Sequence, residues 1–239
     1  MSDLVQSYLK HLQWAAARDS WEQIRSFMLP RPQCVLLDCG CSDGQSTLRV
    51  AQWLKTSEIY GIDLDSRDAA TASRAGVKTC LADLNKRFPF PNNFADVVFA
   101  NQVIEHLTDL DNFVQEVHRV LKKGAYAVVC TENLSSWNNI FALLVGDQPF
   151  TGPHISRKFL VGPHPFQKSI DSVADKIEHN KVLAYKALRQ LFTQYGFEVV
   201  IKGSGYYPLP MFLAKALQRI DKAHSAYLNM KARKADYSI

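Results

Sequence analysis

The chain has 239 residues, of which 47% are apolar and 21% charged, and its formal net charge is +5. This length and composition indicate one soluble globular domain and exclude a fibrous or disordered chain. The positive charge is mild and unclustered, so nucleic acid is not expected as a partner. No apolar stretch approaches the roughly 18 to 20 residues of a membrane span, and the N-terminus lacks a signal-peptide core, so we expect a cytoplasmic protein.

The first segment, residues 1–32, is predicted to be a helical N-terminal extension of a single domain that covers residues 1–239. Its apolar residues recur at helical spacing, and the helix is expected to break near Asp19 and Ser20. Pro30 and Pro32 end the extension.

Short apolar strands and helices of about three turns then alternate along the chain. Strands are predicted at 35–39, 59–63, 77–82, 95–101 and 126–131, and helices at 44–54, 65–75 and 109–121. This alternation is typical of a parallel sheet that is covered on both faces. Closer to the C-terminus, a strand at 197–201 and a period-two pattern at 226–233 predict an edge hairpin that finishes the sheet.

The alternation of strand and helix patterns stops in residues 133–182, which contain four of the ten prolines. One short helix is expected there, with Trp137, Ile140, Phe141 and Leu144 on one face. We interpret the segment as an insertion that forms a lid or substrate wall. A simple packing insertion and a partner surface are the alternatives.

The five cysteines are odd in number and lie mostly in predicted strands, which favours reduced, buried thiols. Cys39 and Cys41 form a CxC pair, but no second pair of soft ligands follows at the spacing of a zinc site. No metal is therefore expected.

The stretch LLDCGCSDG, residues 36–44, follows the first strand and has the look of a nucleotide-binding turn. A dinucleotide fingerprint starting at Gly40 needs glycines at positions 42 and 45, where the chain has Ser42 and Gln45. Carboxylates also end three successive strands: Asp38, Asp63 and Asp83. Three anions repel a pyrophosphate, so the pattern favours a cofactor that carries positive charge or hydrogen-bond donors.

Several motifs resemble, in order and spacing, those of the class I methyltransferases that depend on S-adenosylmethionine (SAM), especially the small-molecule branch. They read VLLDCGCSDG, GIDLD, ADLN, FPFPNNFADVVFANQVIEHL and VHRVLKKGAYAVV, and they cover residues 33–132. The resemblance implies an α/β, Rossmann-like doubly wound sheet of seven strands in the order 3-2-1-4-5-7-6, with the last strand antiparallel. Residues 131–152 and 187–200 are loosely similar to methyltransferases of glycan biosynthesis.

The resemblance also implies that SAM is the cofactor, that S-adenosylhomocysteine is the product, and that the cofactor ligands lie at the strand ends. The residues implied around the methionine part are Asp38, Gly40, Cys41, Ser42, Gly44 and Asn101. Those implied around the ribose and adenine are Asp63, Leu64, Asp83 and Leu84. As an alternative, Asp38 and Asp83 cap helices or turns.

The expected reaction is methyl transfer to a small-molecule or glycan-type acceptor, on oxygen, with a side chain as general base. His106 is the first candidate, followed by His154, His164 and Tyr207. Their alternative roles are to brace the turn or to bind substrate. The segment ANQVIEH lacks the Asn/Asp-Pro-Pro-aromatic form of enzymes that methylate exocyclic amines, which also disfavours nucleic acid as the acceptor. The alternative function is a non-catalytic partner or regulatory protein with the same fold, and the sequence does not indicate an oligomeric state.

Overall fold

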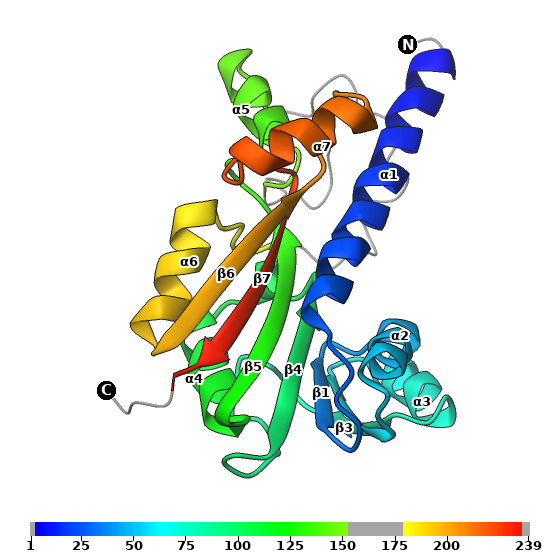
Figure 1. Cartoon of the computed structure of the whole chain (residues 1–239), viewed down its shortest axis with the longest axis vertical. Helices are drawn as coiled ribbons and strands as arrows, with labels where there is room; N and C mark the ends of the chain where they lie inside the picture. Colours follow the sequence, from blue (N-terminus) through cyan, green and yellow to red (C-terminus); the bar gives the residue numbers. More distant parts are fainter. Residues whose placement is uncertain (1–2, 153–178, 236–239) are drawn as a thin grey trace.

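The structure, a computed structural model, describes residues 3–152 and 179–235 (Figure 1). Its helices are α1 (Asp3–Phe27), α2 (Gln45–Leu54), α3 (Ser66–Arg74), the 3-10 turn η1 (Ile104–His106), α4 (Leu110–Val120), α5 (Trp137–Leu144), α6 (Tyr185–Gln194) and α7 (Met211–Ile220). Its strands are β1 (Val35–Cys39), β2 (Glu58–Asp63), β3 (Lys78–Leu81), β4 (Ala95–Asn101), β5 (Leu121–Glu132), β6 (Phe197–Ser204) and β7 (Tyr227–Lys234). In this described part, no helix is long and apolar enough to cross a membrane.

The strands form one sheet in the order β3-β2-β1-β4-β5-β7-β6. The five strands from β3 to β5 pair in parallel, whereas β7 runs antiparallel to both β5 and β6. The predicted strand order and the antiparallel final strand are therefore confirmed. β6 and β7 are the predicted edge pair, visible at the outer edge of the sheet in Figure 1.

Both faces of the sheet are buried, which explains why its central strands read as continuous apolar runs. Along β4, side chains alternate between two clusters: Val98 and Ala100 pack with α4 and α6, while Val97 and Phe99 pack with α1 and α2. Figure 1 shows these two groups of helices on opposite faces of the sheet. The helices thus hold the strand ends in a fixed position, where the loops that follow the parallel strands gather.

The N-terminal extension is helical as predicted, but the expected break near Asp19 and Ser20 is wrong, because α1 is a single helix. Both residues are buried polar side chains of an interface. The Ser20 hydroxyl donates to Asn229 Oδ1 in β7 at 2.7 Å, and Gln218 Nε2 of α7 donates to Asp19 at 3.2 Å. Burial raises the pKa of Asp19. These polar residues therefore join α1 to the C-terminal part of the sheet.

In the insertion, the short helix predicted around Trp137 is confirmed as α5. The role of the segment as a lid stays a prediction, because residues 153–178 lie outside the described chain. The sequence did not predict α7, which begins after Pro210 at its N-cap and lies between β6 and β7. The five cysteines are free thiols, and all except Cys80 are buried.

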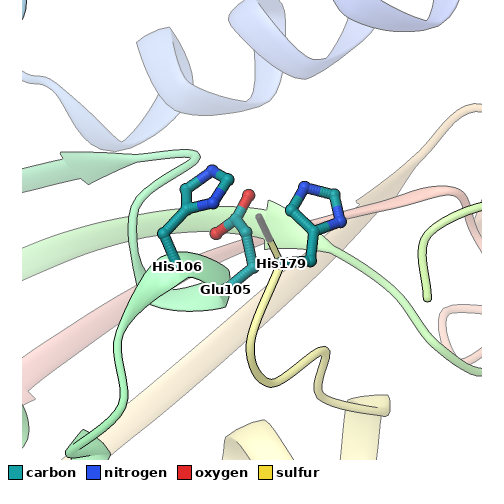
Figure 2. Close-up of side chains that lie close together, drawn as sticks. All are labelled: Glu105, His106 and His179. Carbon is teal, nitrogen blue, oxygen red and sulfur yellow. The ribbon is translucent and has the colours of Figure 1, made fainter. Parts of the chain in front are cut away.

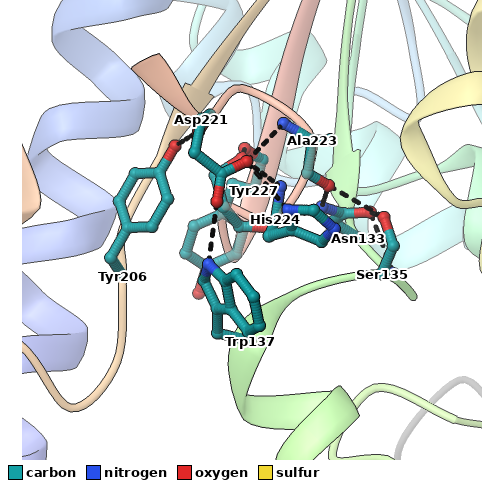
Figure 3. Close-up of polar contacts among 9 residues, drawn as sticks. Asn133, Ser135, Trp137, Tyr206, Asp221, Ala223, His224 and Tyr227 are labelled. Atoms are coloured by element: carbon teal, nitrogen blue, oxygen red, sulfur yellow. Dashed lines mark hydrogen bonds and ion pairs between the residues drawn. The ribbon is translucent and has the colours of Figure 1, made fainter. Parts of the chain in front are cut away.

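A polar network ties the end of β5 to the segment that leads into β7 (Figure 3). Asn133, fully buried, donates through its amide nitrogen to the carbonyls of Ala223 and Ser225 at 2.8 and 2.7 Å. Its own side-chain oxygen accepts from the backbone and hydroxyl of Ser135. Asp221 accepts from Trp137 Nε1 at 2.8 Å, so α5 joins the same network.

Candidate functional site

The loop after β1 is built around two glycines in left-handed conformations. Gly40 has φ +79°, and a Cβ there would lie 2.5 Å from Val103 Cγ2. Gly44 has φ +85° and lies against Ala72 of α3 and Val77, directly before α2. A side chain at either position would be strained by the backbone and short of space. The loop therefore passes close to its neighbours, and its backbone bonds within the protein: the N–H groups of Gly40 and Cys41 donate to the Ile62 carbonyl at 2.8 and 3.0 Å.

Ser42 adopts a positive φ of 45°, which costs a non-glycine residue about 1 kcal/mol. Two hydrogen bonds offset this strain. The backbone N–H of Ser42 donates to Asp63 Oδ2 at 2.7 Å, and its hydroxyl donates to Asp68 Oδ2 in α3 at 3.0 Å. The serine is therefore part of the loop's bracing and does not disrupt it.

Asp38 ends β1 as a buried carboxylate, only 2% exposed. Its one described hydrogen bond comes from the Thr47 hydroxyl of α2, at 2.5 Å to Oδ2. Burial, together with the nearby negative charge of Asp63, raises the pKa of Asp38 to about 7. A cationic group placed beside Asp38 would favour its ionised form.

Asp63 ends β2 one strand away, and its two oxygens each accept one backbone hydrogen bond, from Ser42 and from Asp65. A carboxylate has about four lone-pair positions, so Asp63 keeps capacity for a ligand. Leu64, which follows it, is 70% exposed. The side chain of Leu64 is thus open to contact a flat apolar group.

Beyond β3, the residues predicted to hold the adenine lie in a turn after the strand. Asp83 Oδ1 accepts from the backbone and side chain of Asn85, at 2.9 and 3.0 Å. These contacts match the turn-capping alternative, and the other oxygen, Oδ2, lies 3.9 Å from Lys86 Nζ. Leu84 is buried in the core, and Asn101 ends β4 half-buried. The structure therefore brings the predicted cofactor residues to one edge of the sheet, and their roles stay predictions.

A second cluster of titratable groups follows β4 on η1 (Figure 2). Ligand atoms of Glu105, His106 and His179 all lie within 4.8 Å of one another, and the two imidazole centroids are 4.9 Å apart. Glu105 is fully buried, and burial raises its pKa to about 7. Glu132, at the end of β5, lies 3.6 Å from His179 Nδ1, and burial raises its pKa to about 7 also.

The four candidate bases have different outcomes. His106 lies in the cluster with Glu105, while His154 and His164 lie outside the described residues. Tyr207 follows β6 and stands near Tyr227 and Glu132; burial raises its pKa well above the usual value, so its phenol does not ionise near neutral pH. Tyr207 is therefore better suited to bind a substrate than to act as a base.

Sequence reasoning did not single out Glu132 or His179 as partners of Glu105. Glu132 reads as the last residue of a strand, and His179 lies in the insertion, more than 70 residues from His106. The only signal in the chain was the Glu-His pair that follows β4. Proximity across the fold, which the sequence pattern does not carry, brings these groups together.

The family described as "Methyltransferase domain" matches residues 37–129. An uncharacterized methyltransferase of Schizosaccharomyces pombe is 31% identical over 109 residues, which are 41% of this chain and 39% of that protein. The ubiquinone biosynthesis O-methyltransferase of Pelagibacter ubique is 24% identical over 153 residues, or 62% of this chain and 60% of that protein. A crystal structure of a SAM-dependent methyltransferase from Mesorhizobium loti has a TM-score of 0.61 at 20% identity, covering 93% of this chain and 99% of that chain.

These similarities differ in what they cover. The matched region spans about two fifths to three fifths of the length of the two curated relatives. The solved structure is similar over nearly its whole chain, and at its level of identity it shows a shared fold.

Proposed function

Residues 37–129 form a methyltransferase domain of the class I, SAM-dependent type, and from this premise we propose that the chain transfers a methyl group from SAM to an oxygen atom of a small-molecule acceptor. The observation that carries the proposal is the arrangement at one sheet edge of Asp38 and Asp63 around the left-handed loop at Gly40. Two carboxylates beside a loop without room for a side chain suit a cationic ligand that has hydroxyl donors and no phosphate.

The residues of the chain divide the task of binding. Asp38 would hold the ammonium group, and the loop from Gly40 to Ser42 would hold the methionine part. Asp63 would accept from the ribose hydroxyls with the lone pairs that its backbone contacts leave, and exposed Leu64 would contact the adenine. Gly40 contributes through its backbone alone, because a Cβ there would lie 2.5 Å from Val103 Cγ2.

When bound, SAM supplies a methyl group activated by its sulfonium. The chain's residues then have to hold the acceptor in line with that methyl group, and orientation of this kind supplies roughly 7 to 11 kcal/mol of the barrier. A base that takes the acceptor proton adds roughly 10² to 10⁴ in rate. His106, on the turn that carries Val103 against the loop, is the proposed base.

The choice of acceptor rests on the relatives. The name of the Pelagibacter relative states an O-methyltransferase of ubiquinone biosynthesis, which supports a small molecule with a hydroxyl group as the acceptor. A glycan-type acceptor, which the sequence also allowed, has no such support in the relatives described above. We therefore place a small hydroxylated molecule first and a glycan second.

Calorimetric titration of the chain with SAM, followed by transfer of labelled methyl to a panel of hydroxylated aromatic compounds, tests this function. We expect saturable binding with one site per chain and transfer to at least one hydroxyl compound. No binding at millimolar SAM would refute the enzyme. Binding without transfer to any acceptor in the panel would favour the non-catalytic alternative.

The raised pKa of Asp38 predicts a pH dependence of SAM affinity. Because the pKa of Asp38 is about 7 without ligand, and a bound ammonium lowers it, affinity should rise by up to about tenfold per pH unit as pH approaches 7. It should then fall above about pH 8, where an α-amino group loses its proton. Calorimetry from pH 5.5 to 9 measures both limbs.

Asp38→Asn is the control for this prediction, since an amide keeps an acceptor for the Thr47 hydroxyl but does not titrate. The variant should bind more weakly and lose the rise toward pH 7. An unchanged acidic limb in Asp38→Asn would contradict the contact between Asp38 and the ammonium. The fall above pH 8 belongs to the ligand and should persist.

A further inference from the structure

We propose that Glu105, His106 and His179 form a binding site for a divalent transition-metal ion. One ligand atom from each lies within 4.8 Å of the others, and Figure 2 shows the two imidazoles on either side of the Glu105 carboxylate. Two imidazoles and one carboxylate are a donor set that binds divalent iron, zinc and related ions. The cysteine pattern gave no reason to expect a metal, but these nitrogen and oxygen donors come from three places in the fold.

The Glu105 carboxylate is aimed into this cluster with one oxygen available. The side chain is fully buried, and its Oε2 accepts from the Thr131 hydroxyl at 3.0 Å. Its Oε1, also buried, has no hydrogen-bond partner among the described residues. Buried polar oxygens in proteins are nearly always satisfied, so this one calls for a partner that residues 3–152 and 179–235 do not provide. A metal ion between Oε1 and the imidazoles supplies it.

The hydrogen bond of His179 prepares its other nitrogen for a metal. Nδ1 of His179 lies 2.9 Å from the carbonyl oxygen of Thr151. A carbonyl only accepts, so Nδ1 carries the proton and Nε2 presents its lone pair. Histidines that bind metals usually donate from the second nitrogen to a carbonyl or carboxylate in this way. Glu132, 3.6 Å from the same Nδ1, is a second outer group that favours this tautomer.

Backbone contacts hold the three ligands together before any ion binds. The N–H groups of Asn180 and Lys181 donate to the Glu105 carbonyl at 2.7 and 3.1 Å. The side-chain amide of Asn180 donates to the His106 carbonyl at 2.6 Å. Ligand atoms bonded at about 2.0–2.2 Å lie within roughly 4.4 Å of each other, so small side-chain rotations complete the site.

The location of the metal site suggests that the methyl acceptor also binds there. This step rests on the proposed function. η1 follows Val103, the residue that packs over Gly40, so the metal site adjoins the loop assigned to the methionine part of SAM. Three protein ligands leave coordination positions open. An open position next to the methyl donor would take the acceptor's oxygen, which makes the acceptor a molecule with a metal-binding hydroxyl. A metal-bound imidazole has no free lone pair, so in the metal-bound chain the ion, in place of His106, would promote loss of the hydroxyl proton.

Titration of the full chain with Co²⁺ or Zn²⁺ alone, after removal of bound metal with a chelator, tests the site. We expect one ion per chain by calorimetry, with Co²⁺ absorption typical of nitrogen and oxygen ligands. Glu105→Gln and His179→Ala should each weaken binding by at least about tenfold. The glutamine keeps the shape of the side chain and an acceptor for Thr131, so this variant is expected to fold.

His11→Ala is the matched control, because His11 is exposed on α1, away from η1, and its loss should leave the titration unchanged. Absence of stoichiometric binding to the wild-type chain would overturn the site. So would Glu105→Gln binding as tightly as wild type. SAM affinity, measured without metal, separates the two proposals. A wild-type chain that binds the metal ion but not SAM would refute the proposed function and would leave the metal site supported.

Discussion

Replacing Asp63 with alanine should weaken SAM binding by roughly 100-fold or more. Two hydrogen bonds from ribose hydroxyls to a carboxylate contribute about 1.5 to 3 kcal/mol each, and every 1.4 kcal/mol is a factor of ten in affinity. The change also removes the acceptor of the Ser42 N–H, so the left-handed loop loses a contact that offsets its strain. Isothermal titration calorimetry with SAM measures the effect directly.

Asp65→Ala is the control for this substitution. Asp65 lies two residues further on the same rim and caps α3 by accepting from the backbone of Arg67 and Asp68. Its loss should cost about 1 kcal/mol of stability and leave SAM affinity within a few-fold of wild type. Equal affinities for Asp63→Ala and wild type would refute the assignment of Asp63 to the ribose. A comparable loss of SAM affinity in Asp65→Ala would show that the effect comes from disturbed folding of the segment after β2.

Replacing Asn133 with alanine should lower the free energy of unfolding by roughly 3 kcal/mol. The carbonyls of Ala223 and Ser225 lose the donor that the fully buried Asn133 amide provides, and each unsatisfied buried group costs about 1 to 3 kcal/mol. The half-buried Ala223 carbonyl keeps one donor, the Ser135 hydroxyl at 2.8 Å. For a domain of this size the melting temperature should fall by about 6 to 12 °C. Thermal and urea denaturation followed by circular dichroism measure the change.

Two further variants make the Asn133 prediction specific. Asn133→Asp keeps the acceptor for Ser135 but removes the donors, so it should destabilise the chain at least as much as alanine does. Asn138→Ala, five residues away on α5, removes only one long contact to Asn139 and should change stability by less than about 0.5 kcal/mol. Similar melting temperatures for Asn133→Ala and Asn138→Ala would contradict the role of the network in Figure 3.

Ser42 illustrates a question that the sequence raises and geometry answers. Position 42 stands out because a phosphate-binding turn has glycine there, but the sequence does not give the backbone angle φ of Ser42. The structure places Ser42 at φ 45° and pairs it with Asp63 and Asp68, from the next strand and helix. Those two carboxylates are 21 and 26 residues away in the chain, so no local pattern contains the contacts that make the strain tolerable.

The sequence by itself determined the sheet. Apolar runs of strand length separated by amphipathic helices indicate a parallel sheet buried on both faces. The strand order came from the resemblance of the motifs to those of class I SAM-dependent methyltransferases. Elements are described wrongly from the sequence where their polar side chains form hydrogen bonds with residues that are far away in the chain. The expected break at Asp19 and Ser20 is absent because both side chains pack against the C-terminal half of the chain.

Only the tertiary structure decided how the functional groups meet. The periodicity of apolar residues indicates whether a side chain faces the core or the solvent. It does not indicate which polar groups lie beside that side chain, because such contacts involve segments that are far away in the chain. Glu105 gains its neighbours through a segment that returns some 74 residues later and bonds to the backbone of η1. The cofactor residues share one sheet edge because the ends of parallel strands coincide. The cluster of Glu105, His106 and His179, in contrast, depends on the contact of residues 179–181 with η1.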